Sequence, residues 1–414
     1  MHILFLTDNF PPEVNAPAAR TYEHARQWVR SGHRVTVVTG VPNFPRGEVF
    51  PGYRNRPWQT EILEGIRVVR VWTYVAPNRG FLRRTLDYAS YMATSVLASP
   101  WVGDPDVVVG TSPQFFTVCA AYLVSRIRRL PFVFELRDLW PESIVTVGAM
   151  RPNAAIRLLE KIELFLYREA ASVVALTPAF KENLVKRGVE GSKVHVIPNG
   201  VDLEFFAPGP HRGDLRKALG AEGKTVASYI GTVGMAHAVE RIVEAACLLR
   251  EDDRLLFLIV GHGAEWERIR RLVSGKGLDN VRVLPAVPRG DVVDYYRISD
   301  LFLVTLRDRE LFRTVIPSKL FEAMAVGVPV VCAVDGQCRA IVEEAGAGVF
   351  VPPEDVASMA RAIKALAERP EEARRMGENG RRFVEGRFDR KAMAAKLLAV
   401  LQEVAEGGRG RGGR

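Results

Sequence analysis

The stretch that decides the fold is residues 315–331, which read VIPSKLFEAMAVGVPVV. Pro317 and Ser318 predict the start of a helix, Gly327 predicts its end, and the apolar residues that follow predict a strand. A helix start presents backbone N–H groups and a partial positive charge, which both suit phosphate. Glu322 lies about one helical turn further on, where a carboxylate can bind a sugar hydroxyl. The alternative is an ordinary αβ unit with Glu322 in a capping box, but that motif requires one residue fewer between Ser318 and Glu322.

Apolar runs that suit buried strands alternate with amphipathic helices on both sides of this stretch. Helices are predicted between the strands, for example at 18–31 and 154–171. The predicted strands of the first half are 3–7, 34–39, 67–72, 107–110, 132–135 and 172–176. The predicted strands of the second half are 225–230, 255–260, 281–284, 301–305, 328–332 and 348–351. This alternation predicts an α/β fold of two doubly wound, parallel-sheet, Rossmann-like domains.

Residues 197–209, IPNGVDLEFFAPG, interrupt the alternation with Pro, Asn and Gly, which favour a turn. We therefore predict a first domain at 1–197 and a second domain at 198–385. A last helix at 386–406 is expected to pack on the first domain, and the Gly-rich basic tail at 407–414 is expected to be disordered. Open α/β sheets bind ligands at the carboxyl ends of their strands, so two such domains predict a binding cleft between them.

Length and composition exclude several classes of protein. A chain of 414 residues suits two domains, and no run reaches the roughly 20 apolar residues of a membrane-spanning helix. The first ten residues lack the basic region and cleavage site of a signal peptide, so a cytoplasmic protein is expected. The four cysteines have no zinc-ligand spacing, and HExxH and EF-hand patterns are absent, which predicts buried thiols and no metal held by the protein.

The net charge of +9 is concentrated in the first half of the chain. Residues 1–200 hold 24 Lys and Arg against 17 Asp and Glu, whereas the remaining residues hold 33 against 31. A basic first domain suits an acidic substrate, an anionic membrane surface or nucleic acid. No nucleic-acid-binding motif accompanies the charge, so phosphate or membrane contact is the favoured interpretation.

Two glycine-containing loops of the second half are further candidates for phosphate contact. Residues 229–237 read YIGTVGMAH, so backbone can approach closely and His237 can act as a cationic donor near a helix start. A packing turn with a capping histidine is an equally good interpretation. Residues 259–265, IVGHGAE, contain a GxG that tight βα turns often use. Lys319 adds a mobile ammonium suited to a diphosphate.

Taken together, these motifs resemble the retaining glycosyltransferases of family 4, which have the GT-B fold. The resemblance covers residues 1–406 and rests on VIPNGVD at 196–202, IVGHGAE at 259–265 and FEAMAVGVPVV at 321–331. Three further runs are similar to the bacterial branch that builds surface polysaccharides, N-acetyl-L-fucosamine transferases among them. These runs are FELRDLWPES at 134–143, GMAH at 234–237 and IPSKLFEAMA at 316–325. The resemblance implies transfer of a hexose or N-acetylaminosugar from a nucleoside-diphosphate sugar, with UDP expected, to a lipid-linked glycan acceptor.

The same resemblance assigns the donor site to the second domain. Glu322 matches the second Glu of the family's E-x7-E element, which holds the ribose, whereas Thr314 stands where the first Glu would contact the transferred sugar. The family's diphosphate-binding Arg and Lys correspond to Thr232 and His237, which leaves Lys319 as the expected replacement. Lys319, His237 and Thr314 are therefore the expected catalytic residues. The other expected donor-binding residues are Gly231, Gly234, Gly261, Leu284, Pro285, Pro317 and Ser318.

Acceptor contacts are expected in the first domain. The resemblance places Asn15 and Ala16 where the family has a Gly-rich loop near the acceptor. Arg137 and Asp138 follow a strand and are the expected polar pair, although a salt bridge between them is an equally good interpretation. Asn43 lies in a loop at the same edge, where it can contact the acceptor sugar or serve the loop alone.

The segment 78–101 places Arg79, Arg83 and Arg84 before an apolar helix, and residues 126–129 end another helix with RIRR. Basic residues beside an apolar face predict contact with anionic lipid, with a buried helix as the alternative.

Two other functions remain open. One is a nucleotide-sugar epimerase of the same fold, which would need acid and base groups that the sequence does not place. The other is a catalytically silent scaffold of a polysaccharide complex, which Thr314 suggests.

Overall fold

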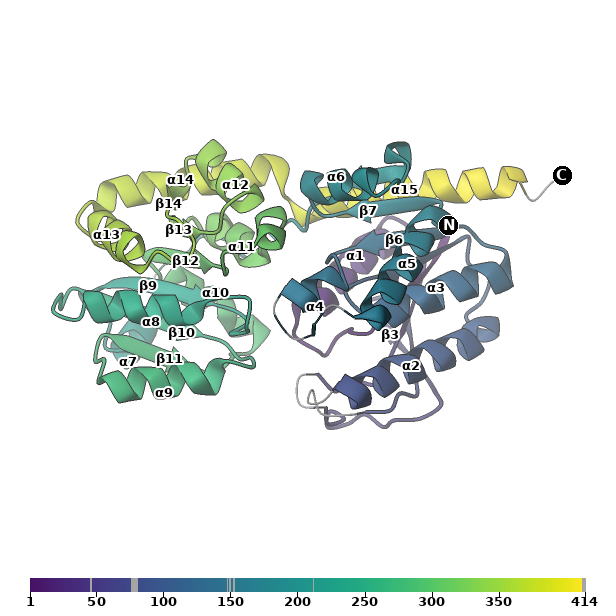
Figure 1. Cartoon of the computed structure of the whole chain (residues 1–414), viewed down its shortest axis with the longest axis horizontal. Coiled ribbons are helices and arrows are strands. Elements are labelled where there is room, and N and C mark those ends of the chain that lie inside the picture. Colours follow the sequence, from purple (N-terminus) through teal and green to yellow (C-terminus); the bar gives the residue numbers. More distant parts are fainter. Residues whose placement is uncertain are drawn as a thin grey trace. The chain divides into compact units, whose positions relative to one another are not determined.

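The chain forms two compact α/β units (Figure 1). The computed structural model describes residues 1–44, 47–75, 81–146, 148, 150–151, 153–210 and 212–411. The first unit comprises Met1–Asn199 together with the chain from Arg390 onward, and the second unit comprises Gly200–Asp389. The chain thus passes between the units twice, near residue 200 and near residue 390.

The first unit is built on a sheet with the strand order β3-β4-β2-β1-β5-β6-β7-β8. Its strands are β1 (His2–Leu6), β2 (Arg34–Thr39), β3 (Trp58–Leu63), β4 (Ile66–Val71), β5 (Val107–Thr111), β6 (Phe132–Leu136), β7 (Ser172–Ala175) and β8 (Val194–Val196). Among the described residues, all pairs are parallel except β3 with β4. The inner strands are buried on both faces, which accounts for their continuous apolar runs.

Helices cover both faces of the first sheet (Figure 1). They are α1 (Ala16–Arg30), α2 (Phe81–Ala98), α3 (Phe115–Arg128), α4 (Glu142–Thr146), α5 (Ala154–Glu169), α6 (Pro178–Lys186) and α15 (Arg390–Arg411), with short 3₁₀ turns at Ser99–Trp101 and Gly191–Lys193. The last helix completes the core of this unit. Trp28 of α1 donates a hydrogen bond of 2.9 Å to the carbonyl of Ala394, and Met393, Leu397 and Leu401 of α15 pack into the same apolar cluster.

The second unit is a six-stranded parallel sheet in the order β11-β10-β9-β12-β13-β14. Its strands are β9 (Thr225–Ile230), β10 (Leu255–Val260), β11 (Val281–Leu284), β12 (Leu301–Thr305), β13 (Val330–Ala333) and β14 (Gly348–Phe350). Its helices are α7 (Gly213–Ala218), α8 (Val239–Leu248), α9 (Trp266–Lys276), α10 (Arg289–Arg297), α11 (Ser318–Val326), α12 (Gln337–Ala345), α13 (Val356–Ala367) and α14 (Pro370–Arg387), with a 3₁₀ turn η3 at Glu310–Thr314. Helices α8 and α13 pack together over one face, and α11 packs with α14 over the other. The predicted fold class is confirmed.

The structure differs from the sequence prediction at three places. Strand β3 was not predicted, because its sequence WQTEIL mixes polar and apolar residues and none of them is fully buried. It forms a hairpin with β4 through the two-residue turn Glu64–Gly65, and both turn residues have positive φ. The short edge strand β8 was not predicted either. The last helix was predicted at 386–406, but α14 ends at Arg387 and α15 continues to Arg411 through the first residues of the expected disordered tail. Packing of α15 on the first unit overrides the low helix propensity of its terminal glycines.

Within the described residues, no helix combines the length and the apolar character that a bilayer span requires.

Candidate functional site

The start of α11 lies where the sequence predicted it. Helix α11 begins at Ser318 after Pro317, which has an extended backbone, and ends at Gly327, whose positive φ of 86° terminates the helix. The predicted boundaries are therefore confirmed, because Pro, Ser and Gly are local signals. In the first turn the N–H of Leu320 donates to the carbonyl of Pro317 at 3.0 Å, and the positive end of the helix dipole gives this end a favourable potential for an anion.

Lys319 is buried beside the loop that leaves β9. Its Nζ lies 3.7 Å from the centre of the Tyr229 ring and has no hydrogen-bond partner among the described residues. A Cβ on Gly231 would lie 3.1 Å from this Nζ, so glycine is needed there to leave room for the ammonium. Burial lowers the pKa of Lys319 to about 7, and the nearby Glu322 opposes this shift only in part. The expected mobile, fully charged ammonium is thus corrected to a buried group that titrates near neutrality.

Tyr296 of α10 orients the carboxylate of Glu322. The hydroxyl of Tyr296 donates a hydrogen bond of 2.6 Å to Oε2 of Glu322. The Tyr296 ring stacks on Phe302 and meets Phe206 edge to face, so the hydroxyl has a fixed position. Burial, reinforced by Glu322, raises the pKa of Tyr296 well above its usual range, which keeps the hydroxyl protonated as a donor. Oε1 of Glu322 is left for a ligand.

The two glycine loops of the second unit touch each other backbone to backbone. A Cβ on Gly261 would lie 1.8 Å from the carbonyl oxygen of Gly231, and one on Gly263 would lie 2.3 Å from that of Val233. The hydroxyl of Tyr229 donates a hydrogen bond of 2.5 Å to the carbonyl of Thr232. These glycines therefore serve close approach between the loops after β9 and β10. This contact between the loops was not predicted from the IVGHGAE pattern, which indicated either phosphate contact or an ordinary tight turn.

Three successive carbonyls of the loop after β9 are held by the end of β12. Arg307 donates Nε to the carbonyl of Met235 at 2.7 Å and its backbone N–H to that of Ala236 at 2.9 Å. The hydroxyl of Thr305 donates to the carbonyl of His237 at 2.6 Å. Sequence reasoning did not find this clamp, because nothing local to Arg307 indicates its partners.

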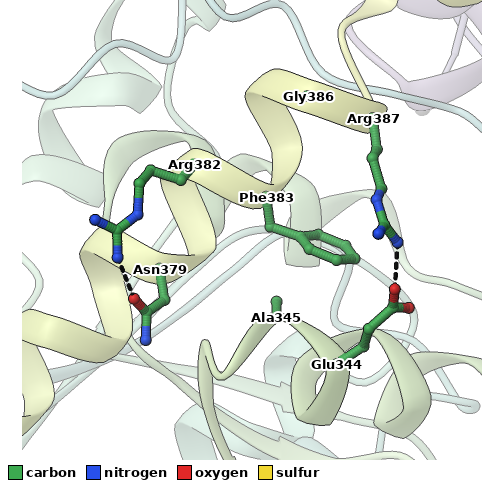
Figure 2. A pocket seen from close by; sticks show the side chains of 7 residues that line it. All are labelled: Glu344, Ala345, Asn379, Arg382, Phe383, Gly386 and Arg387. Atoms are coloured by element: carbon green, nitrogen blue, oxygen red, sulfur yellow. Dashed lines mark hydrogen bonds and ion pairs between the residues drawn. The ribbon is translucent and has the colours of Figure 1, made fainter.

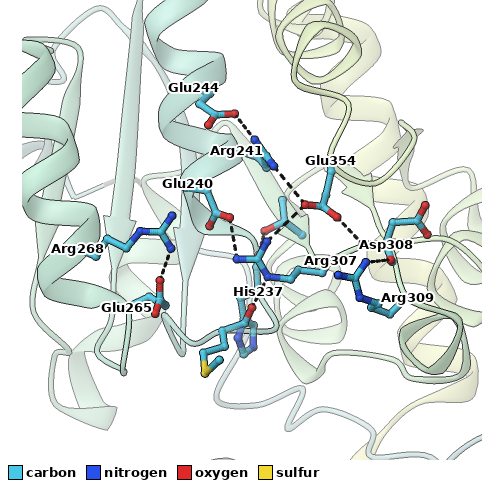
Figure 3. A network of polar contacts seen from close by, with 12 residues as sticks. His237, Glu240, Arg241, Glu244, Glu265, Arg268, Arg307, Asp308, Arg309 and Glu354 are labelled. Atoms are coloured by element: carbon cyan, nitrogen blue, oxygen red, sulfur yellow. Dashed lines mark hydrogen bonds and ion pairs between the residues drawn. The ribbon is translucent and has the colours of Figure 1, made fainter. Parts of the chain in front are cut away.

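Arg307 is itself held by two carboxylates. Its guanidinium forms ion pairs with Glu240 at 2.9 Å and with Glu354 at 3.5 Å. Glu354 also accepts from Arg241 and from the backbone N–H of Asp308 (Figure 3). The charge of Arg307 is therefore neutralised locally, and its contribution to the site is the geometry of the loop.

His237 is corrected from a cationic donor to a neutral one. Burial, together with the nearby charge of Lys319, lowers the pKa of His237 to about 3. Its Nδ1 is buried without a hydrogen-bond partner among the described residues. Two adjacent cations in one buried site would repel each other, so His237 offers an uncharged ring beside Lys319.

The remaining donor-side candidates lie at the ends of other elements of the second unit. Thr314 ends the 3₁₀ turn η3, and its hydroxyl donates a hydrogen bond of 2.6 Å to the carbonyl of Leu311. The carbonyl of Leu284 accepts from Gly261 N at 3.2 Å and from Trp266 Nε1 at 3.3 Å, whereas Pro285 is exposed. The structure thus places Leu284 next to the glycine loops.

Three of the acceptor-side candidates lie in the loops after β1 and β2 or at the helix start that follows. Asn15 caps α1, since its side chain accepts from the N–H of Ala18 at 2.8 Å, and Ala16 is the first residue of that helix. The N–H of Asn43 donates to Glu13 at 2.9 Å, and so does the N–H of Phe44 at 2.8 Å. Glu13 therefore ties the loop after β1 to the loop after β2.

Arg137 and Asp138 follow β6 and do not pair with each other among the described residues. Asp138 instead accepts a hydrogen bond of 2.8 Å from Ser143. The N–H of Arg137 donates to the hydroxyl of Ser112 at 2.8 Å. The salt-bridge interpretation of this pair is therefore wrong, and Arg137 remains available for another partner.

A hollow on the second unit lies away from all of these candidates. It is formed between the end of α12 and α14 and is lined by Glu344, Ala345, Asn379, Arg382, Phe383, Gly386 and Arg387 (Figure 2). Arg382 donates to Asn379, and Arg387 forms an ion pair with Glu344. Since these charged groups already satisfy one another, we do not place the functional site there.

Among the described residues, no group of three or more His, Cys, Asp or Glu side chains is arranged to hold a metal.

Two family descriptions match this chain. Glycosyl transferase 4-like domain matches residues 15–200, and Glycosyl transferases group 1 matches residues 212–383. WcaI of Escherichia coli (strain K12), a glycosyl transferase named for colanic acid biosynthesis, is 26% identical over 382 residues, which are 88% of this chain and 91% of WcaI.

Two solved structures share the fold. Sucrose-phosphate synthase from Thermosynechococcus elongatus has a TM-score of 0.78 at 19% identity and covers 98% of this chain and 99% of its own. Anabaena HepE in complex with UDP and glucose has a TM-score of 0.74 at 18% identity and covers 97% and 99%. At such identities the likeness shows the fold, which is GT-B. With a Glycosyl transferase 4-like domain in its first unit and a group 1 domain in its second, the chain belongs to the glycosyltransferases of the GT-B fold.

Proposed function

We propose that this protein is a retaining glycosyltransferase that moves a hexose or N-acetylaminosugar from a UDP-linked donor to a lipid-linked glycan in polysaccharide biosynthesis. The observation that carries the proposal is the start of α11, where a buried, unpartnered Lys319 and the tyrosine-held Glu322 share one helical turn. A cation and a helix N-terminus suit a diphosphate, and a carboxylate one turn away suits the ribose hydroxyls.

In the proposed reaction the bond between the sugar C1 and the diphosphate oxygen breaks while the acceptor oxygen attacks the same face. The acceptor proton passes to an oxygen of the departing diphosphate. Lys319 and the amides after Pro317 stabilise the charge that develops on that leaving group. Thr314 offers its hydroxyl oxygen to the transferred sugar, and the uncharged His237 offers a hydrogen bond. The proposal assigns no metal to the reaction.

The other donor contacts follow from the positions of the glycine loops. Gly231, Thr232 and Gly234 lie on the loop that Arg307 and Thr305 hold, so we assign them to the diphosphate. Leu284 and Pro285, at the end of β11, are assigned to the base. The UDP present in the HepE structure supports uracil as the first base to test.

The acceptor is proposed to bind the first unit through Asn15, Ala16, Asn43, Arg137 and Asp138. Ala16 begins α1, and the other four lie in the loops after β1, β2 and β6. The name of WcaI, which refers to colanic acid biosynthesis, supports a polysaccharide product. A lipid-linked acceptor would bring the protein to the inner face of the cell membrane.

Helices α2 and α3 supply the surface that we assign to membrane contact. Exposed apolar residues are Leu86 and Leu97 on α2, Trp101 in the 3₁₀ turn after it, and Leu123 and Ile127 on α3. Arg83, Arg84, Arg126 and Arg129 are exposed beside them, whereas Arg79 lies outside the described residues. Apolar and basic groups on one face suit an anionic lipid surface. Flotation with vesicles that contain anionic lipid should recover the protein, and recovery should fall for Leu97→Asp; equal recovery from zwitterionic vesicles would contradict the assignment.

Donor binding and donor hydrolysis together test the main proposal. Thermal shift against a panel of nucleotide sugars should show stabilisation by one donor, because a ligand of the folded state stabilises by mass action. Incubation with that donor should release free sugar slowly. Release of an epimer would indicate the epimerase instead, and binding without any turnover on glycan acceptors would indicate the silent scaffold.

A further inference from the structure

A cluster of charged side chains lies inside the first unit, at the carboxyl end of β6. Arg20 and His24 come from α1, Glu135 from β6, and Arg137 from the residue that follows the strand. Arg20 donates Nε to Oε1 of Glu135 at 2.9 Å, with both side chains almost fully buried. Arg390, at the start of α15, is ion-paired with Glu23 and raises the positive potential at Arg20 and Arg137.

The cluster contains more buried donors than acceptors. Nη1 of Arg20 donates to the carbonyl of Pro198 and to the side chain of Asn199, both at 3.1 Å, but its Nη2 is buried without a hydrogen-bond partner among the described residues. Nε and Nη1 of Arg137 are likewise buried without a partner among the described residues, and on the acceptor side so is Oε2 of Glu135, which leaves three such donors against one carboxylate oxygen. Buried donors of a charged group are costly to leave unsatisfied, so their number calls for an acceptor.

The charges of the cluster also favour an anionic ligand. Three guanidinium groups face the two carboxylates of Glu23 and Glu135, and His24 is neutral because burial and the three arginines hold its pKa well below the usual range. Burial, with repulsion from Arg20 and Arg390 and against the attraction of Glu135, lowers the pKa of Arg137 to about 10. Among these five groups one positive charge is therefore in excess. Arg137 is partly exposed, and it lies at the edge where parallel sheets bind ligands.

We propose that Arg137, backed by the Arg20–Glu135 pair, forms an oxyanion site of the first unit that receives a phosphoryl group. A phosphoryl oxygen pair matches the planar donor edge of a guanidinium, and its charge balances the excess of the cluster. The Arg20–Glu135 pair fixes the site, since Arg20 is tied to β6 and to the carbonyl of Pro198 at once. The site itself does not depend on the proposed transferase activity.

The source of the phosphoryl group does rest on the proposed function. One source is a phosphate carried by the acceptor, and the other is the diphosphate of the donor. These sources make different demands on Lys319, which lies in the second unit. Arg137→Gln and Lys319→Ala therefore distinguish the two sources of the phosphoryl group.

The first arm titrates inorganic phosphate into the full chain at constant ionic strength, by calorimetry and by thermal unfolding. Phosphate at about ten times its Kd should raise the Tm of the wild type and of Lys319→Ala by about 3 °C, and should raise that of Arg137→Gln by less than about 1 °C. Arg137→Lys keeps the charge and loses the planar edge, so its affinity should fall about tenfold. In phosphate-free buffer, Arg137→Gln should melt no lower than the wild type, because it relieves repulsion in the cluster.

Two results of this arm would overturn the proposal: no response of the wild type to phosphate, or the same response in Arg137→Gln. The second arm measures the affinity for whichever of UDP, GDP and ADP binds best. Loss of affinity in Lys319→Ala alone assigns the phosphoryl group at Arg137 to the acceptor, and loss in both variants assigns it to the donor. If none of these nucleotides binds the wild type, the proposed function fails while the phosphate result stands.

Discussion

Tyr296 and Glu322 are 26 residues apart in the sequence and are joined by a hydrogen bond of 2.6 Å between the tyrosine hydroxyl and Oε2 of the carboxylate. The bond fixes which carboxylate oxygen faces a ligand. If Glu322 holds the ribose, the affinity for the nucleotide depends on a residue that never contacts it.

Tyr296→Phe should therefore weaken binding of the nucleoside diphosphate about tenfold, as expected for a lost hydrogen bond to a charged group. The ring and its stacking on Phe302 remain, so the second unit should stay folded. Tyr167→Phe is the matched control, because the buried hydroxyl of Tyr167 also donates at 2.6 Å to a glutamate, Glu163, in the first unit. Titration calorimetry of both variants would contradict the idea if they bound the nucleotide equally well.

Lys319→Ala should reduce turnover by about 10²–10³, because the departing diphosphate loses its cation. Folding should remain intact, since the alanine removes a buried, unpartnered ammonium rather than a packed apolar group. The comparison variant is Lys276→Ala, which removes an exposed lysine at the end of α9. Turnover of Lys319→Ala close to that of Lys276→Ala would show that the leaving group is stabilised elsewhere.

The stability cost of Lys319 should depend on pH. Its pKa is 10.5 when unperturbed and about 7 in the fold, so between these values the unfolded chain binds one proton more than the folded chain. Stability due to this residue therefore rises with pH across that window, and the cost is largest below pH 7. Lys319→Met should be more stable than the wild type at pH 6.5 by up to about 5 kcal/mol, with the gap closing toward pH 10. Urea unfolding at a series of pH values measures this gap, and a gap that stays constant would contradict the shifted pKa.

Arg307→Gln should release the loop that carries Met235 and His237 while leaving the sheet intact. The variant loses the hydrogen bond to the carbonyl of Met235 and the ion pairs to Glu240 and Glu354. The KM for the donor should rise about tenfold with a smaller change in kcat, because the loop must be ordered on binding. Arg268→Gln breaks a more exposed ion pair with Glu265 and should leave KM unchanged. An equal KM in both variants would mean that the loop keeps its shape without the clamp.

Gly261→Ala should destabilise the second unit by more than about 3 kcal/mol, because the new Cβ would lie 1.8 Å from a backbone oxygen that cannot move aside cheaply. Gly275→Ala has nothing within 4 Å of the new Cβ and lies in α9, so it should stabilise by about 0.5 kcal/mol. If the two glycine loops meet as described, urea unfolding should show a lower free energy of unfolding for Gly261→Ala and a slightly higher one for Gly275→Ala.

The sequence predicted those parts of the site that depend on neighbours along the chain. The boundaries of α11 follow from Pro317, Ser318 and Gly327, and the strands follow from continuous apolar runs. The state of each side chain did not follow, because it is set by distant residues: Tyr229 lies under Lys319, 90 positions away, and Glu135 pairs with Arg20 across 115 positions. His237 was predicted to be cationic because histidine ordinarily titrates near neutrality, and only its burial beside Lys319 shows otherwise.

The contribution of α15 to the core of the first unit has a consequence for synthesis on the ribosome. Trp28 and its apolar neighbours remain without Met393, Leu397 and Leu401 until the last residues of the chain have emerged. The second unit is continuous in the sequence from Gly200 to Asp389 and has no such dependence. The unit that is translated first is therefore the last to be completed, and nascent chains that stop before residue 390 carry a finished second unit beside a first unit with an open core.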